Sequence, residues 1–329
     1  MNRKAVILFS GGLDSILAGR LMLEQQIEIE AVNFMSVFFI KNEALPTIDN
    51  IGVKLKIFDI TPEHICIVKS PQYGYGKNMN PCLDCRVCML KKAAEYMKEA
   101  GASFLVTGEV LGERPMSQRQ EAFNLVEKAA GLKGKILRPL SAKLLRPTIA
   151  EQNGIVNRNK LLNIQGRGRN YQIDLAKQKG ISNYPVPSGG CLLTDPEFSD
   201  RLRELLANQS PEVSDIQLLK YGRHFRLSNG FKVIIARDEK EIECLLGLAE
   251  QGDMIFDLAD FAGPITIVKG RRNTDGLGWI KNIAALTARY SKVRDKKEVR
   301  VKYCCVPQKT EEYVLVTPRS AEELGIARI

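Results

Sequence analysis

The strongest constraint on the fold is a short polar turn between two apolar segments near the start of the chain. Residues 4–9 read KAVILF, a run of branched and aromatic side chains that is typical of a buried strand. Leu13, Leu17 and Leu21 then recur every four residues, which is the spacing of one helix face. The intervening SGGLDS therefore predicts a strand that turns directly into a helix, the first unit of an α/β fold.

The residues of this turn are suited to binding a phosphate group. Gly11 and Gly12 lack side chains, so backbone N–H groups at the start of the helix can approach an anion, which the helix dipole also favours. Ser10 and Ser15 add hydroxyl donors. Asp14 repels phosphate unless it orients a backbone amide or holds a Mg²⁺ ion that the phosphate also binds. We therefore predict a phosphate-binding loop, in which Asp14 orients a backbone amide or holds Mg²⁺, rather than an ordinary glycine turn with a serine cap.

Strand-like and helical patterns alternate beyond this turn. Helical patterns cover residues 86–100 and 118–130, and strand-like runs lie at Lys4–Phe9, Ile29–Phe34, Lys56–Ile60 and Phe104–Thr107. This alternation predicts an α/β fold with a mostly parallel sheet, helices on both of its faces, and ligands at the carboxyl ends of its strands. Residues 207–215 have linker composition and precede a small α+β pattern, so the predicted domains are 1–210 and 211–329.

Two other strand ends supply candidate nucleotide contacts. Phe34 ends one strand and either lines an adenine pocket or belongs to the core. Thr107, Gly108 and Glu109 end another, where they are expected to border the nucleotide pocket. For Glu109 the alternative is a carboxylate that stabilises the start of a helix.

Composition limits the compartment and the partners. No apolar stretch is long enough to cross a bilayer and the first residues do not form a signal peptide, which predicts a cytoplasmic protein without a membrane partner. The chain has 48 Lys and Arg against 38 Asp and Glu, a formal charge of +10 that favours a polyanionic partner. Residues 157–170 and 289–303 concentrate basic side chains, which either follow an RNA backbone or form solvated faces.

A cluster of cysteines indicates metal or sulfur chemistry. Cys82, Cys85 and Cys88 recur every three residues, and Cys191 follows a second pair of glycines. Thiols stay reduced in the cytoplasm, and three thiolates in one short turn repel one another unless they share a cation. Zinc would use all four in a closed site, whereas an iron–sulfur cluster could use three and leave one iron open.

Several segments resemble known enzyme families. SGGLDS is similar to the SGGxDS signature of the PP-loop ATP pyrophosphatases, which cleave ATP between its α and β phosphates and pass AMP to a substrate oxygen. NPCLDC (80–85) and PSGGCLLTD (187–195) resemble segments of the tRNA 2-thiouridylases. VTGEVLGERPMSQ (106–118) and ILRPL (136–140) resemble the tRNA 4-thiouridine synthases. Residues 222–237 and 283–292 resemble the small, RNA-associated NFACT-R domain.

The resemblance implies a tRNA sulfurtransferase with the adenine nucleotide α-hydrolase-like fold, and 4-thiouridine is favoured over 2-thiouridine as its product. ATP and Mg²⁺ would bind the loop with Asp14 in a catalytic role, and a uridine carbonyl oxygen would displace pyrophosphate. Sulfide, or a persulfide on Cys191, would then expel AMP.

The implied cofactors are ATP, Mg²⁺ and a [4Fe–4S] cluster held by three of the cysteines, with Zn²⁺ as the alternative. The implied partners are tRNA and a sulfur donor, either sulfide or a persulfide carrier. Two other functions stay open. One is an ATP-dependent enzyme that forms amides or inserts sulfur into a small molecule, and the other is a non-catalytic RNA-binding protein.

Overall fold

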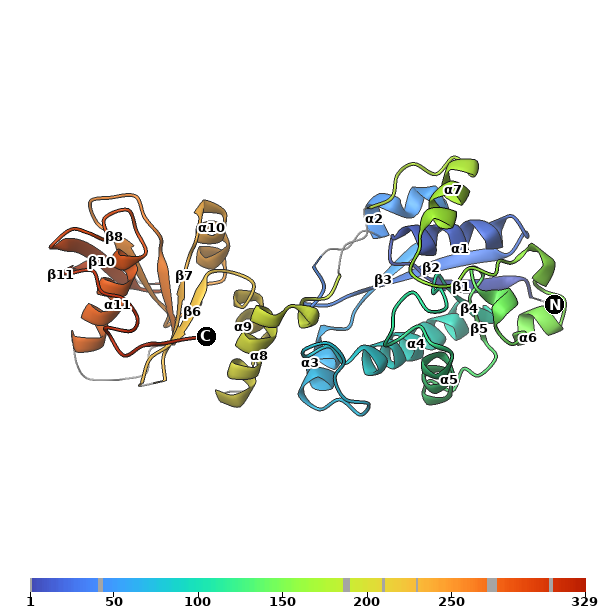
Figure 1. Ribbon diagram of the computed structural model, residues 1–329, viewed down its shortest axis with the longest axis horizontal. Coiled ribbons are helices and arrows are strands. Elements are labelled where there is room, and N and C mark those ends of the chain that lie inside the picture. Colours follow the sequence, from blue (N-terminus) through green and yellow to red (C-terminus); the bar gives the residue numbers. More distant parts are fainter. Residues whose placement is uncertain are drawn as a thin grey trace. The chain divides into compact units, whose positions relative to one another are not determined.

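The computed structural model describes residues 2–40, 44–185, 190–208, 211–228, 230–270, 277–307 and 310–329. The chain divides into two compact units, Met1–Asp195 and Pro196–Ile329, each with its own sheet and apolar core (Figure 1). Within these described ranges, no helix is both long enough and apolar enough to cross a membrane.

The first unit is built on five strands: β1 (Lys4–Leu8), β2 (Glu28–Met35), β3 (Leu55–Asp59), β4 (Phe104–Thr107) and β5 (Ile136–Leu137). They form one sheet in the order β3-β2-β1-β4-β5, and all neighbours in it are parallel. Its longer helices are α1 (Leu13–Leu23), α3 (Thr61–Lys69), α4 (Cys82–Glu99), α5 (Gln120–Ala129) and α7 (Asn170–Gln178), and its short ones are α2 (Ala44–Thr47) and α6 (Ile149–Gln152).

Helices cover both faces of this sheet, because successive residues of a strand point to opposite sides. Ala5 and Ile7 pack into a core with α1 and α7, whereas Val6 and Leu8 pack into a second core with α4 and α5. The predicted mostly parallel sheet with helices on both faces is confirmed.

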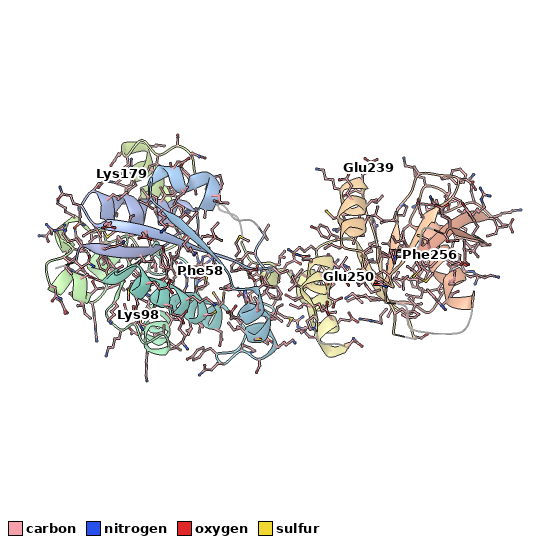
Figure 2. The ribbon with its side chains drawn as sticks, turned by 180° about the vertical axis from the view of Figure 1, so that it is seen from behind. Phe58, Lys98, Lys179, Glu239, Glu250 and Phe256 are labelled. Carbon is pink, nitrogen blue, oxygen red and sulfur yellow. The ribbon has the colours of Figure 1, made fainter. Side chains whose placement is uncertain are left out.

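The second unit contains an antiparallel sheet in the order β11-β10-β8-β9-β7-β6-β12. Its strands are β6 (Arg223–Arg226), β7 (Lys232–Ile235), β8 (Met254–Leu258), β9 (Thr266–Lys269), β10 (Val299–Cys305), β11 (Glu312–Val316) and β12 (Ala327–Arg328). One face packs on α11 (Leu277–Arg289), with Phe256 fully buried there, and the other packs on α9 (Val213–Leu218) and α10 (Glu239–Gly247) (Figure 2). The predicted small α+β domain is confirmed.

The two units divide at Asp195, earlier than the boundary that the linker composition suggested near residue 210. Helix α8 (Pro196–Asn208) lies between these positions and belongs to the second unit. Its Glu204 accepts hydrogen bonds from Arg226 Nε at 2.6 Å and from Lys232 Nζ at 3.1 Å. These bonds attach α8 to β6 and β7. The second unit therefore begins with α8, and most of the linker-like residues 207–215 lie inside that unit.

The pairing of β1 with β4 brings the turn after β4 against the first turn of α1. Leu8 lies opposite Thr107 in this parallel pair. A Cβ atom added to Gly108 would lie 2.5 Å from the backbone nitrogen of Ser15 and 2.6 Å from the carbonyl carbon of Asp14. Backbone atoms cannot yield as a flexible side chain does, so only glycine fits at this position.

We expect Gly108→Ala to destabilise the first unit by at least about 1–3 kcal/mol through overpacking, and to weaken nucleotide binding because the loop is displaced. Thermal unfolding and ATP titration measure the two effects. Gly247→Ala is the matched control, since a Cβ there meets nothing within 4 Å. Wild-type stability and ATP affinity in Gly108→Ala would contradict the close approach.

Candidate functional site

The turn after β1 has the geometry of an anion-binding loop. Gly11 has a φ of 80°, in the left-handed region that favours glycine, and Gly12 is the N-cap of α1. The Ser15 hydroxyl donates to the Gly12 carbonyl oxygen at 2.7 Å, and the Gly12 N–H lies 3.4 Å from Ser10 Oγ. The free N–H groups at the start of α1 thus face the end of the sheet where a phosphate would bind.

The Asp14 carboxylate is largely buried beside this loop. Its Oδ2 lies 3.4 Å from Arg169 Nη2, and its buried Oδ1 has no hydrogen-bond partner within the described part of the chain. Burial raises the pKa of Asp14, and Arg169, Gln172 and Arg114 oppose that effect. Burial raises the pKa of Glu113, and the nearby charge of Asp14 raises it further. An unpartnered carboxylate oxygen next to a second acid fits a Mg²⁺ ion.

Thr107 and Glu109 are both buried at the end of β4. Thr107 Oγ1 and Arg138 Nε each donate to Glu109 Oε2 at 3.0 Å, and Arg86 Nε lies 3.2 Å from Oε1. Burial raises the pKa of Glu109, but the guanidinium groups of Arg86 and Arg138 outweigh it, and the pKa is lowered. No described helix starts at Glu109, so the helix-start alternative is wrong. The predicted nucleotide contact stays a prediction.

Cys191 is held at the same end of the sheet by backbone hydrogen bonds from two distant segments. It forms an antiparallel bridge with Phe39, just after β2, where the Leu192 N–H donates to the Phe38 carbonyl oxygen at 2.9 Å. On its other side, the Met79 N–H donates to the Leu193 carbonyl oxygen at 3.1 Å. Met79 lies three residues before α4 begins. Its hydrogen bond to Leu193 therefore places Cys191 near the cysteines at the start of that helix.

Three of the four predicted cysteines share one neighbourhood. Cys82 and Cys85 lie in the first turn of α4. Burial raises the pKa of the Cys85 thiol, and the nearby Cys191 and Cys82 raise it further. Burial also raises the pKa of Cys191 to about 11, with a further contribution from Cys82. The Cys88 pKa is raised by burial and by Glu63. Cys88 lies one helical turn beyond Cys85, and its charge acts on Cys85.

These thiols do not as they stand form a metal site. Among the residues that the structure describes, no three Cys, His, Asp or Glu side chains are arranged to hold a metal ion. The structure nevertheless brings Cys82, Cys85 and Cys191 close enough for their charges to interact. Metal binding by these cysteines and by Cys88 stays a prediction.

Two arginines that the sequence analysis did not assign connect the nucleotide loop with the thiols. Arg86 pairs with Glu109 and its charge also acts on Cys82 and Cys85. The charge of Arg114 acts on both Asp14 and Cys191. Arg86 directly follows Cys85, and a cation next to a thiol is a sequence signal that could have identified it.

Phe34 packs in the core rather than at the surface of the site. Its side chain is 9% exposed, and its ring lies 5.9 Å from that of Phe58 in a stacked arrangement. A role beside adenine stays a prediction.

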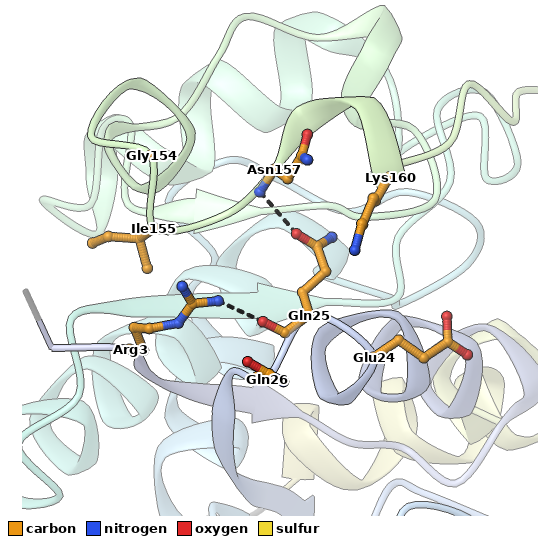
Figure 3. Close-up of a pocket in the computed structure, with 8 residues that line it drawn as sticks. All are labelled: Arg3, Glu24, Gln25, Gln26, Gly154, Ile155, Asn157 and Lys160. Atoms are coloured by element: carbon orange, nitrogen blue, oxygen red, sulfur yellow. Dashed lines mark hydrogen bonds between the residues drawn. The ribbon is translucent and has the colours of Figure 1, made fainter.

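A small cavity lies at the amino ends of β1 and β2, the end of the sheet opposite to the nucleotide loop. It measures about 260 Å³ and lies next to the start of β1 and the turn that precedes β2 (Figure 3). Its polar lining includes Arg3, Gln25 and Lys160, and Gln25 Oε1 accepts the N–H of Asn157 at 2.8 Å. None of the predicted site residues lines it.

Comparison with known families matches two parts of the chain. Residues 1–144 match the family described as Thiamine biosynthesis protein (ThiI), and residues 222–326 match the NFACT protein RNA binding domain. The first 144 residues are thus similar to the ThiI family. The resemblance of the first part to thiouridine-forming enzymes and of the second to an NFACT-R domain is confirmed.

Curated relatives match parts of the chain of different length. A probable tRNA sulfurtransferase of Lysinibacillus sphaericus (strain C3-41) is 30% identical over 46% of this chain and 39% of the relative. A tRNA-specific 2-thiouridylase MnmA of Pseudomonas fluorescens (strain Pf0-1) is 23% identical over 68% of this chain and 61% of the relative. This chain thus spans less than two thirds of the length of either relative.

Among solved structures, a 4-thiouridine synthetase in complex with RNA and ATP is 19% identical to this chain. The match covers 65% of this chain and 52% of that one, with a TM-score of 0.41.

In the first unit, Glu109→Gln should lower the free energy of unfolding at neutral pH by about 3–5 kcal/mol, because the buried Arg138 and the partly exposed Arg86 lose their shared carboxylate. The lowered pKa of Glu109 stabilises the fold above the ordinary value of 4.5, and this stabilisation is lost as pH falls through the folded-state pKa. The variant should therefore lose less stability than wild type on acidification.

Urea unfolding at neutral pH and at about pH 3, well below the ordinary pKa of 4.5, measures both differences. Glu121→Gln, at an exposed position of α5, is the matched control and should behave as wild type. Equal stability of wild type and Glu109→Gln at neutral pH would contradict the ion-pair assignment.

Proposed function

We propose that this chain is an ATP-dependent tRNA sulfurtransferase that replaces a uridine carbonyl oxygen by sulfur, with 4-thiouridine favoured over 2-thiouridine. The observation that carries the proposal is that the nucleotide loop and the segment of Cys191 lie at the same end of the sheet, where the charge of Arg114 acts on both Asp14 and Cys191. The printed names of the relatives, a tRNA sulfurtransferase and a tRNA 2-thiouridylase, support the same reaction.

The first step is transfer of AMP to the uridine. Backbone N–H groups at Gly12 and beyond, with the hydroxyls of Ser10 and Ser15, bind the phosphates. Mg²⁺ held by Asp14 would neutralise phosphate charge. The uridine carbonyl oxygen forms a bond to the α phosphorus, and the bond from that phosphorus to the bridging oxygen of pyrophosphate breaks. Rate enhancement comes from positioning and charge neutralisation.

The second step is attack by sulfur on the activated carbon. Sulfide, or the outer sulfur of a persulfide on Cys191, forms the C–S bond while the C–O bond to AMP breaks. In the persulfide case a neighbouring thiol such as Cys82 then attacks the Cys191 sulfur, which releases the thiouridine and leaves a disulfide for a thiol reductant. A [4Fe–4S] cluster at Cys82, Cys85 and Cys191 would instead offer an open iron for sulfide.

The proposed partner is tRNA, and the proposed location is the cytoplasm, where ATP and tRNA meet. Residues 222–326 match an RNA-binding domain, and the chain carries a formal charge of +10. Within the two basic segments, Arg167, Arg289 and Lys292 are exposed and available to phosphates.

Asp14→Asn and Cys191→Ala should each fail to restore thiouridine to the bulk tRNA of a deletion strain, measured by mass spectrometry of nucleosides. The first should also abolish tRNA-dependent pyrophosphate release, whereas the second should leave it intact, because Asp14 serves AMP transfer and Cys191 serves sulfur transfer. Asp174→Asn, at an exposed acid of α7, is the control and should restore thiouridine. Thiouridine at wild-type levels in the deletion strain would overturn the proposal.

Protein prepared without air should bind about four iron ions per chain, the content of one [4Fe–4S] cluster. Replacing Cys82, Cys85 or Cys191 by Ala should remove the iron, whereas Cys88→Ala should keep it, because neither Cys82 nor Cys191 is among the groups whose charges act on Cys88. Metal analysis measures the result. A fully active protein with one zinc ion and no iron would contradict the cluster and favour a closed zinc site.

A further inference from the structure

Buried polar atoms without partners concentrate where α7 packs against α1. Arg169 is the N-cap of α7, and Gln172 follows within its first turn and is fully buried. Across the described residues, four atoms of these two side chains and Asp14 have no hydrogen bond of good geometry: Asp14 Oδ1, Arg169 Nε, Gln172 Oε1 and Gln172 Nε2. The Gln172 amide still lies close enough to Asp14 to lower the pKa of its carboxyl group. Unmet hydrogen-bonding capacity of this kind, gathered at one place, indicates a ligand-binding position.

The hydrogen bond from Arg169 Nη2 to Asp14 Oδ2 is long. Their closest atoms are 3.4 Å apart, whereas a charge-assisted N–H···O bond is about 2.7–2.9 Å long. A guanidinium carries five N–H donors in a planar fork that matches the oxygens of a phosphate. Arg169 therefore retains donors for a second, anionic partner next to the nucleotide loop.

The direction of the Arg169 side chain separates it from the rest of its basic segment. Arg167, two residues earlier, is exposed to solvent. The Arg169 side chain is only 20% exposed and points to the Asp14 carboxylate at the start of α1. An arginine in this position meets a phosphate on the loop more readily than an RNA backbone at the surface.

We infer that Arg169 binds the triphosphate of ATP, with the Gln172 amide as a positioning group for Asp14. This inference rests on the proposed function, because it assigns a residue to the same nucleotide site. When a Mg²⁺ ion takes the Asp14 oxygens, the Arg169 fork turns from the carboxylate to phosphate oxygens, and both groups gain full partners. Arg169 is thus part of the nucleotide site and not of the tRNA surface.

The test is calorimetric titration of the full chain with MgATP, paired with tRNA binding. Arg169→Ala should raise the Kd for MgATP about tenfold to a hundredfold, the usual effect of losing a hydrogen bond to a charged group. It should leave tRNA affinity within about twofold of wild type. Arg167→Ala is the matched control and should leave the Kd for MgATP unchanged. Arg169→Lys, which keeps the charge and loses the fork, should give an intermediate Kd.

The outcomes separate this inference from the proposed function. Wild-type MgATP affinity in Arg169→Ala, or an effect no larger than that of Arg167→Ala, would overturn the inference while the proposed function stands. Weakened tRNA binding with unchanged MgATP affinity would return Arg169 to the RNA surface. If Arg169→Ala does not fold, as judged by circular dichroism, wild-type affinity in Arg169→Lys overturns the inference. No MgATP binding by the wild-type chain would overturn both.

Discussion

The backbone of Gly108 lies directly against the backbone of Asp14 and Ser15, and the arrangement of the site depends on this contact. It exists because β1 and β4 are neighbours in a parallel sheet, so the turns that follow them meet at one edge. The contact fixes the start of α1, and with it the N–H groups that a helix start offers to an anion. It also places Glu109, the residue after Gly108, within reach of the helix that carries the cysteines, where Arg86 Nε lies 3.2 Å from its Oε1.

The ion pairs of Glu109 connect the turn after β4 with the helix that carries Cys82 and Cys85. Glu109 lies between Arg86 and Arg138, and a carboxylate with two guanidinium partners is stable in the interior only in a well-defined geometry. Arg86 comes from α4, so the ion pair fixes that helix relative to β4. The raised pKa values of Cys85 and Cys191 mean that these thiols stay protonated at neutral pH until a cation or a bound sulfur changes their surroundings.

The sequence predicted well those features that depend on residues close together in the chain. The strand of residues 4–8 and the loop after it follow from apolar runs and glycines, and the structure reproduces them within one or two residues. The inward direction of Arg169 was missed, because a run of basic residues does not reveal which side chains turn into the fold. The early domain boundary was missed for a related reason: the ion pairs of Glu204 join residues far apart in sequence.

The meeting of Cys191 with Cys82 could be expected only from family resemblance, since it depends on pairing between segments about 110 and 150 residues apart. That pairing uses main-chain atoms: the Leu192 and Met79 N–H groups and the carbonyls of Phe38 and Leu193. Main-chain bonds are indifferent to side-chain identity. The walls around the sulfur atom can therefore diverge during evolution, and accept differently shaped substrates, while the reactive atom keeps its place.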